Sequence, residues 1–188
     1  MVAVAIIGII ASFGAPSYIT WLKNLRLESA YQELQGSLLT ARSQALTSQN
    51  VVILCRTGDV FSDNPSCGAN VFGTTDTNVA KEWTHGWLVY SGDTPGVDYV
   101  SANHDLLAAI HTGVADNKVI ITSNTAADEH ISYRANGRIV EASPIFAVCD
   151  DRDDEKNGYR MTFSATGRPI VRRFSSGELS SGDKTCTP

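Results

Sequence analysis

Four histidines are the residues of this sequence best suited to catalysis or metal binding, because imidazole acts as a general base or a metal ligand near neutral pH. They are His85, His104, His111 and His130. None has a metal-binding spacing such as HExxH, and the sequence has neither a nucleophile elbow nor a glycine motif that cradles phosphate. Asp128-Glu129-His130 places a base beside carboxylates, but neighbours in a predicted loop do not converge on a substrate by spacing alone. We therefore expect no catalytic residue, no metal and no cofactor.

The cysteines offer a second kind of chemistry. They are Cys55, Cys67, Cys149 and Cys186, and they lack the CxxC spacing of zinc and redox sites. Two disulfides are expected, and the sequence alone permits three pairings. A Cys55–Cys67 bridge would close a loop rich in Pro, Gly and Asn, and a Cys149–Cys186 bridge would fasten the C-terminal tail, each contributing roughly 3 to 4 kcal/mol. Disulfides favour the bacterial periplasm or cell surface over the alternative of free buried cysteines in the cytosol.

Acidic residues are concentrated between residues 141 and 155, where six acids stand against Arg152. The run from Asp150 to Glu155 offers hard oxygen ligands of the kind that Ca²⁺ prefers. It lacks the spaced pattern and central glycine of an EF-hand loop, so we do not expect a calcium site there. The net charge of −5 also argues against a protein that coats nucleic acid along its whole surface.

Basic residues dominate the end of the chain, where three arginines, Arg168, Arg172 and Arg173, fall on the last predicted strand. Strand alternation puts Arg168 and Arg172 on one face, about 13 Å apart, with Arg173 on the opposite face. Two guanidinium groups at that distance suit phosphates along one groove, so double-stranded DNA is a candidate partner through salt-sensitive contacts. The alternative is that these arginines cover the strand and pair with the acids at 150–155.

The element that must position these residues is one long helix, predicted from the N-terminus to about Gln49. Residues 1–15 are uncharged and apolar on every side, which is typical of a helix buried in lipid or among other helices. At ~1.5 Å per residue they cover roughly 22 Å, less than the ~30 Å hydrocarbon core of a bilayer, and we expect a few further residues to precede them. Tyr18 and Trp21 suit a membrane interface. The alternative is a helix buried in its own domain, for which a chain of 188 residues that also builds a β-rich remainder has little material to spare.

The second half of the helix is amphipathic, since its apolar residues narrow to one stripe that should pack against a globular domain. The stripe consists of Leu27, Tyr31, Leu34, Leu38, Ala41 and Ala45. After the helix the apolar period changes from 3.6 to 2. Strands are predicted at 51–55, 87–90, 118–122, 131–133, 145–148, 159–163 and 170–174, with 106–110 either a strand or a helical turn.

Asn136-Gly137 is the strongest short hairpin signal and predicts a two-residue type I′ turn that joins a strand at 131–134 to a second strand at 138–140. The expected fold class is α+β, with a long N-terminal helix packed against a C-terminal domain of seven to nine mostly antiparallel strands. We expect residues 1–26 to form the apolar helix segment and residues 27–188 to form the globular head.

Several short motifs occur in an order found in a known family. They are Ala15-Pro16-Ser17-Tyr18, Arg26-Leu27, Ala41-Arg42-Ser43-Gln44-Ala45, Val52-Ile53-Leu54-Cys55, Gly86-Trp87-Leu88-Val89-Tyr90, Ala135-Asn136-Gly137-Arg138 and Thr166-Gly167-Arg168. In this order they resemble the type IV pilins and type II secretion pseudopilins, and most closely the GspH/FimT group of minor pilins. Family members begin with a short leader ending in glycine, then an aromatic residue and a glutamate. None of these precedes Met1, and we expect them upstream.

The resemblance implies a structural subunit of a type IV pilus or type II secretion pseudopilus, placed near the tip. The chain would be anchored in the bacterial inner membrane by a single pass, with its head in the periplasm, before it joins the filament. Its partners would be other pilins or pseudopilins, contacted through the helix residues Ile6, Ile7, Ile9, Ile10, Phe13 and Pro16. A DNA-uptake pilin is the second hypothesis, because Gly167-Arg168 resembles the start of the Gly-Arg-any-Arg motif of some FimT proteins, although Ile170 stands where the second arginine would be. A periplasmic enzyme with an N-terminal anchor is the third.

Overall fold

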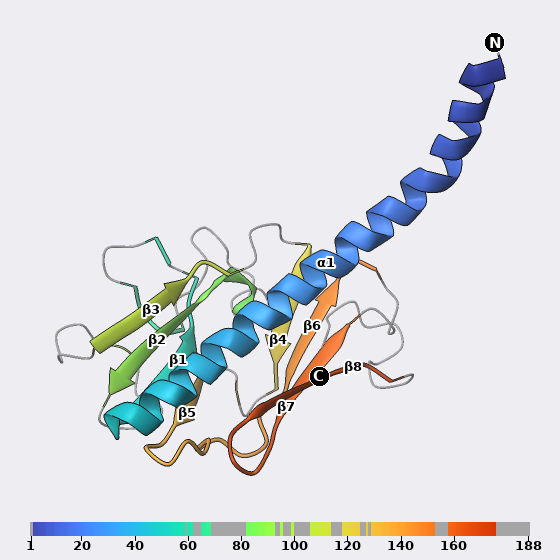
Figure 1. Ribbon diagram of the computed structural model, residues 1–188. Coiled ribbons are helices and arrows are strands. Elements are labelled where there is room, and N and C mark those ends of the chain that lie inside the picture. The colour runs from blue at the N-terminus through green and yellow to red at the C-terminus, as the bar shows by residue number, and fades with distance from the viewer. Residues whose placement is uncertain are drawn as a thin grey trace.

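A computed structural model describes residues 2–58, 60–61, 65–68, 82–92, 95, 99, 106–113, 118–124, 127, 129–152 and 158–175; within the first helix it describes side chains from Ser17 onward. Within these residues, one long helix is followed by eight strands and a short 3₁₀ helix (Figure 1). The elements are α1 (Val2–Ser48), β1 (Val51–Arg56), η2 (Trp83–His85), β2 (Trp87–Gly92), β3 (Leu106–His111), β4 (Val119–Ser123), β5 (His130–Tyr133), β6 (Phe146–Asp150), β7 (Tyr159–Phe163) and β8 (Pro169–Arg173).

The strands form two four-stranded sheets, with orders β3-β2-β1-β5 and β4-β6-β7-β8, and every described pairing is antiparallel. The predicted α+β class is confirmed, and so are the strands that form the two sheets, with ends shifted by one or two residues. The segment 138–140, predicted as the second strand of a hairpin, is not a strand and forms only an isolated bridge between Ile139 and Tyr133. The ambiguous segment at 106–110 is a strand. Its position at the edge of its sheet explains the ambiguity, because Leu107 and Ile110 are partly exposed and break the apolar alternation.

Helix α1 lies across both sheets and supplies the centre of the core (Figure 1). Its buried residues are Leu27, Ala30, Leu34, Ser37, Leu38, Ala41 and Ala45. They pack against Trp87 and Val89 of one sheet and against Phe146 and Val148 of the other. The predicted stripe is confirmed, with Tyr31 partly buried at its margin and Ala30 and Ser37 as additions.

The two ends of α1 differ. At its C-terminal end, Gln49 adopts a left-handed conformation with φ 59°, and its side-chain amide donates a hydrogen bond to the Leu46 carbonyl at 2.7 Å. At the other end the helix runs unbroken through Pro16 and extends away from the head toward the N-terminus (Figure 1). Proline has no amide hydrogen, so the helix lacks one backbone hydrogen bond at that point.

The turn at Asn136-Gly137 differs from the predicted type I′ turn. Gly137 donates to the Arg134 carbonyl, Arg134 donates to the Arg138 carbonyl, and only Gly137 has a positive φ, at 73°. The connection is therefore a three-residue loop, a type I turn followed by a left-handed glycine. The same pattern recurs between Ser164 and Arg168, where Gly167 has φ 81°.

These two loops contact each other and the end of the helix. The Arg138 Nε donates to the Ala165 carbonyl at 3.1 Å, and the Arg42 Nε donates to the Gly137 carbonyl at 3.1 Å. A Cβ atom on Gly167 would lie 2.3 Å from the Gly137 carbonyl oxygen, which leaves no space for a side chain. The Gly137 and Gly167 motifs, far apart in the sequence, thus form one structural unit.

Replacing Gly167 with alanine should lower the free energy of unfolding by about 2 kcal/mol or more, because the new Cβ meets backbone and the left-handed conformation is strained. Gly36→Ala is the matched control, since a Cβ there meets nothing within 4 Å and alanine is favoured in a helix by about 1 kcal/mol. Urea unfolding of the full chain in detergent would measure both. An unchanged midpoint for Gly167→Ala would contradict the close approach of the two loops.

Candidate functional site

The part of α1 that leaves the head carries exposed apolar side chains. Tyr18, Ile19 and Trp21 are each more than half exposed, and Leu25 is 41% exposed, whereas burial begins at Leu27. Isolated exposed apolar residues are ordinary, but four within eight residues of one helix are typical of a contact surface. This surface adjoins the uncharged segment 1–15 in the sequence.

The residues predicted to pack in a filament, Ile6, Ile7, Ile9, Ile10, Phe13 and Pro16, all lie on α1, and their side chains lie outside the described part of the structure. Within the described residues, no helix is both long and apolar enough to cross a bilayer. The role of these residues therefore stays a prediction.

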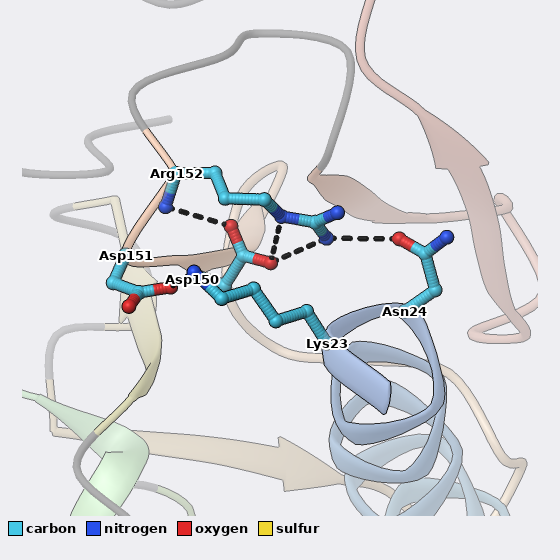
Figure 2. A network of polar contacts seen from close by, with 5 residues as sticks. All are labelled: Lys23, Asn24, Asp150, Asp151 and Arg152. Atoms are coloured by element: carbon cyan, nitrogen blue, oxygen red, sulfur yellow. Dashed lines mark hydrogen bonds and ion pairs between the residues drawn. The ribbon is translucent and has the colours of Figure 1, made fainter. Parts of the chain in front are cut away.

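A polar network fastens α1 to the head at the point where the helix leaves it (Figure 2). The Lys23 Nζ lies 2.7 Å from a carboxylate oxygen of Asp151. The Arg152 Nη2 donates to the Asn24 Oδ1 at 2.8 Å, and the Arg152 Nε donates to the Asp150 carboxylate at 2.6 Å. Asp150 is almost fully buried, so its carboxylate holds Arg152 in the position that reaches the helix.

The hydrogen bond from Lys23, together with its positive charge, holds the pKa of the Asp151 carboxyl below its ordinary value of 3.8. A carboxylate with a lowered pKa in the folded state stabilises the fold above its ordinary pKa and loses that contribution as the pH falls through the folded value. The contact is therefore complete at neutral pH. Because Asp151 is about half exposed, solvent screens most of its energy.

The predicted DNA-binding arginines lie at and beside β8, an edge strand. Arg168 precedes the strand in the turn, and Arg168, Arg172 and the intervening Ile170 are exposed. Arg173 stacks over the Tyr159 ring at 5.4 Å, and Tyr159 in turn packs on Tyr31 of α1 at 4.4 Å between ring centroids. Arg173 therefore lies on the helix side of the sheet.

The described acids of the run 150–155 do not pair with the arginines of β8 in any contact that the structure shows between them. Asp150 pairs with Arg152 and Asp151 pairs with Lys23, so two of its acids stabilise the helix junction. The remaining acids, Asp153, Asp154 and Glu155, lie outside the described residues. The sequence did not predict the ion pair between Lys23 and Asp151, because the two residues are far apart in the chain. The one available signal is that Lys23 is the first charged residue after the apolar segment 1–15.

The Cys55–Cys67 disulfide is present, with 5.5 Å between the Cα atoms. It covers the face of the β1–β2 sheet turned away from α1, where Ile53, Leu88 and Tyr90 are buried beside Cys67. Cys149 is also disulfide-bonded, and its predicted partner Cys186 lies outside the described residues.

The histidines and neighbouring acids make separate structural contacts. Glu129 lies 3.6 Å from the Arg56 guanidinium, while His130 lies 3.8 Å from the Glu141 carboxylate. His111 stacks on a buried tryptophan, with its Nε2 3.2 Å from the Ser37 hydroxyl. Asp128 and His104 lie outside the described residues. In the part of the chain that the structure covers, no group of three or more His, Cys, Asp or Glu residues could hold a metal ion.

Comparisons with known proteins agree with this architecture. Residues 30–167 match the model of the family described as "Type II transport protein GspH". Two crystal structures of the type IV minor pilin FimU from Pseudomonas aeruginosa strain PAO1 share the fold at 21% identity and cover 78% of this chain. They are themselves covered over 87% and 92% of their length, with TM-scores of 0.54 and 0.52. No curated protein matches the sequence significantly.

A long helix whose lower half is buried across two small antiparallel sheets, and whose upper half extends beyond them, defines a type IV pilin-like fold. The match to the family model spans more than half of the chain. The protein therefore belongs to the GspH family of minor pilins and pseudopilins. Members of this family are structural proteins.

Asp150→Ala should lower the free energy of unfolding by about 1 to 3 kcal/mol, because it leaves the largely buried Arg152 guanidinium without its carboxylate. Lys23→Ala, a control in the same network, should cost less than about 1 kcal/mol, since its partner is half exposed. Hydrogen–deuterium exchange should show faster exchange at residues 20–26 in Asp150→Ala. Equal effects of the two substitutions would contradict the assigned role of Asp150.

Proposed function

We propose that this protein is a structural subunit of a type IV pilus or type II secretion pseudopilus. Before assembly, α1 would anchor it in the bacterial inner membrane with the head in the periplasm, and after assembly α1 would pack with the helices of other pilins. The observation that carries the proposal is the change along α1 at Leu27. From Leu27 onward one stripe of the helix is buried in the head, whereas Tyr18, Ile19 and Trp21 before it are more than half exposed. The disulfide fits an oxidising compartment.

The mechanism of assembly follows from the apolar surroundings that α1 requires before Leu27. Moving an apolar helix from lipid into a bundle of helices changes its neighbours more than its hydrophobic environment, so helix packing must favour the filament. The core and the Arg152 network hold the lower half of α1 on the head, so each subunit would join as one rigid piece. A position near the tip is part of this proposal, as the resemblance to the minor pilins implies.

The second candidate function is DNA binding during uptake, and it rests on the exposure of Arg168 and Arg172 at the edge of a sheet. Arg173 contributes less in this arrangement, because its guanidinium lies over Tyr159 on the helix side. Ile170 occupies the exposed position between the two arginines, where the resembling motif would carry its second arginine. The expected binding is therefore weak and strongly salt-dependent.

Ile10→Arg should abolish filament assembly while the head stays folded, since a charge in the middle of the apolar segment is costly both in lipid and in a helix bundle. Phe61→Arg is the control, because Phe61 is 88% exposed on the head. Both variants would be expressed in a deletion strain of the source bacterium, with surface pili and secretion scored separately. Normal assembly with Ile10→Arg would argue against the filament role.

The DNA hypothesis predicts a gel shift of double-stranded DNA at low salt that weakens at least tenfold between 50 and 200 mM salt. Replacing Arg168, Arg172 and Arg173 with alanine should remove it. The single variant Arg173→Ala should retain most of it, because its side chain stacks on Tyr159. Absence of a shift at low salt, or an equal shift with the triple variant, would exclude these arginines as a DNA site.

A further inference from the structure

Strand β3 is an outer strand of the sheet β3-β2-β1-β5, and among the described strands only β2 lies beside it (Figure 1). Alternate backbone groups of an edge strand point away from its single neighbour. No hydrogen bond joins residues 106–110 to a described residue outside β2. The strand therefore presents backbone donors and acceptors with which another extended chain can pair.

The side chains of β3 do not hinder such pairing. The strand has six residues, no proline, and no charge from Leu106 to Ile110. Leu107 and Ile110 pair with Tyr90 and Leu88, so both lie on the face turned away from α1, where they are 37% and 41% exposed. Native edge strands are normally protected by charge, proline, short length or a covering segment. The described part of β3 has none of these protections.

The edges of β5 and β4, by contrast, are covered. The Ser132 carbonyl on β5 accepts a hydrogen bond from the Val140 amide, and the Ser132 amide donates to the Glu141 carboxylate. The segment that follows β5 thus occupies its outer side. On β4, the Ile121 amide donates to the Thr84 hydroxyl of η2 at 2.9 Å. Both edges already have partners within the head.

The fourth edge, β8, is protected by its composition. Pro169 has no amide hydrogen to donate, and Arg172 and Arg173 place charge on the strand. Both are devices that discourage strand pairing. Among the sheet edges that the structure describes, β3 is therefore the one that remains open to an added strand.

We infer that β3 is a docking strand, which takes an extended, uncharged segment of a different filament subunit as a fifth strand of its sheet. Backbone hydrogen bonds supply the affinity in this mode of recognition, and side-chain contacts supply the specificity. Leu107 and Ile110 select apolar side chains on the outer face of the partner segment. The inference rests on the proposed filament role, and it names the kind of contact that one neighbour makes.

The geometry of pairing excludes a second copy of this chain as the occupant. In its described residues a copy offers only β3 as an open edge, and two β3 strands paired antiparallel are related by a two-fold axis perpendicular to the sheet. That axis reverses every direction in the plane of the sheet, including the direction of α1, which packs on this sheet. Subunits of the proposed filament have parallel α1 helices, so the partner is a different subunit.

Amide hydrogen exchange of the full chain in nonionic detergent tests the inference. The probe is a capped heptapeptide of alternating threonine and valine, and its control is the same peptide N-methylated at every residue, which has the same side chains but no backbone donors. At a probe concentration of about ten times its Kd, exchange at residues 106–111 should slow by about tenfold. The N-methylated peptide should leave this exchange unchanged, and this comparison needs no variant.

Ile110→Lys should abolish the slowing, because it puts a charge on the open edge. Ile170→Lys is the matched control, since Ile170 is 49% exposed on the outer strand of the other sheet. It should retain the slowing. In the deletion strain, Ile110→Lys should reduce filament assembly and Ile170→Lys should leave it normal.

The absence of slowing at about 1 mM probe would overturn the inference. Equal slowing by the N-methylated peptide, or slowing at residues 169–173 in place of 106–111, would do the same. Slower exchange at 106–111 as the protein concentration rises without peptide would assign the strand to a second copy and so contradict the assigned partner.

Failure of the docking strand is distinguishable from failure of the filament role. Lost assembly with Ile10→Arg, together with no protection by the probe, would remove the docking strand alone. Normal assembly with Ile10→Arg would remove the filament role, whatever the exchange of residues 106–111.

Discussion

The packing of the α1 stripe against both sheets is the interaction on which the rest of the structure depends. The described strands pair only within their own sheet, so the helix and the side chains beneath it hold the two sheets together. Ala41 and Ala45 are fully buried and small, which allows the helix backbone to approach closely. Trp87 and Phe146, one from each sheet, lie in the same core. The lower half of the helix is therefore part of the core of the head.

The upper half of α1 has apolar side chains that the head does not cover, and this contrast along one helix is the main functional feature of the chain. Tyr18 and Trp21 remain exposed, and the transition to burial occurs within a few residues, at Leu27. The Lys23 and Asn24 contacts mark the same boundary with polar groups. A chain built in this way carries a helix with exposed apolar side chains on a packed head, which suits assembly with similar subunits.

Periodicity in the sequence was sufficient to predict the helix, its buried stripe and the strands, because burial on one face imposes a regular spacing. Periodicity was insufficient where the same residues are compatible with two turn geometries. Asn136-Gly137 fits a two-residue turn as well as the observed three-residue loop, which places only the glycine at positive φ. The Asp151–Lys23 contact arises from residues far apart in the chain, and nothing in local spacing encodes it.

Pro16 lies on α1 above the last point at which the head holds the helix, and this placement separates two mechanical requirements. Below Lys23, the core and the Arg152 network keep the helix at a fixed angle to the sheets. Above Lys23, Pro16 cannot donate a backbone hydrogen bond, so bending the helix there costs little free energy and no contact with the described part of the head opposes it. In the proposed role, a bend at Pro16 would let the N-terminal part of the helix take different tilts in a bilayer and in a filament while the head keeps its shape.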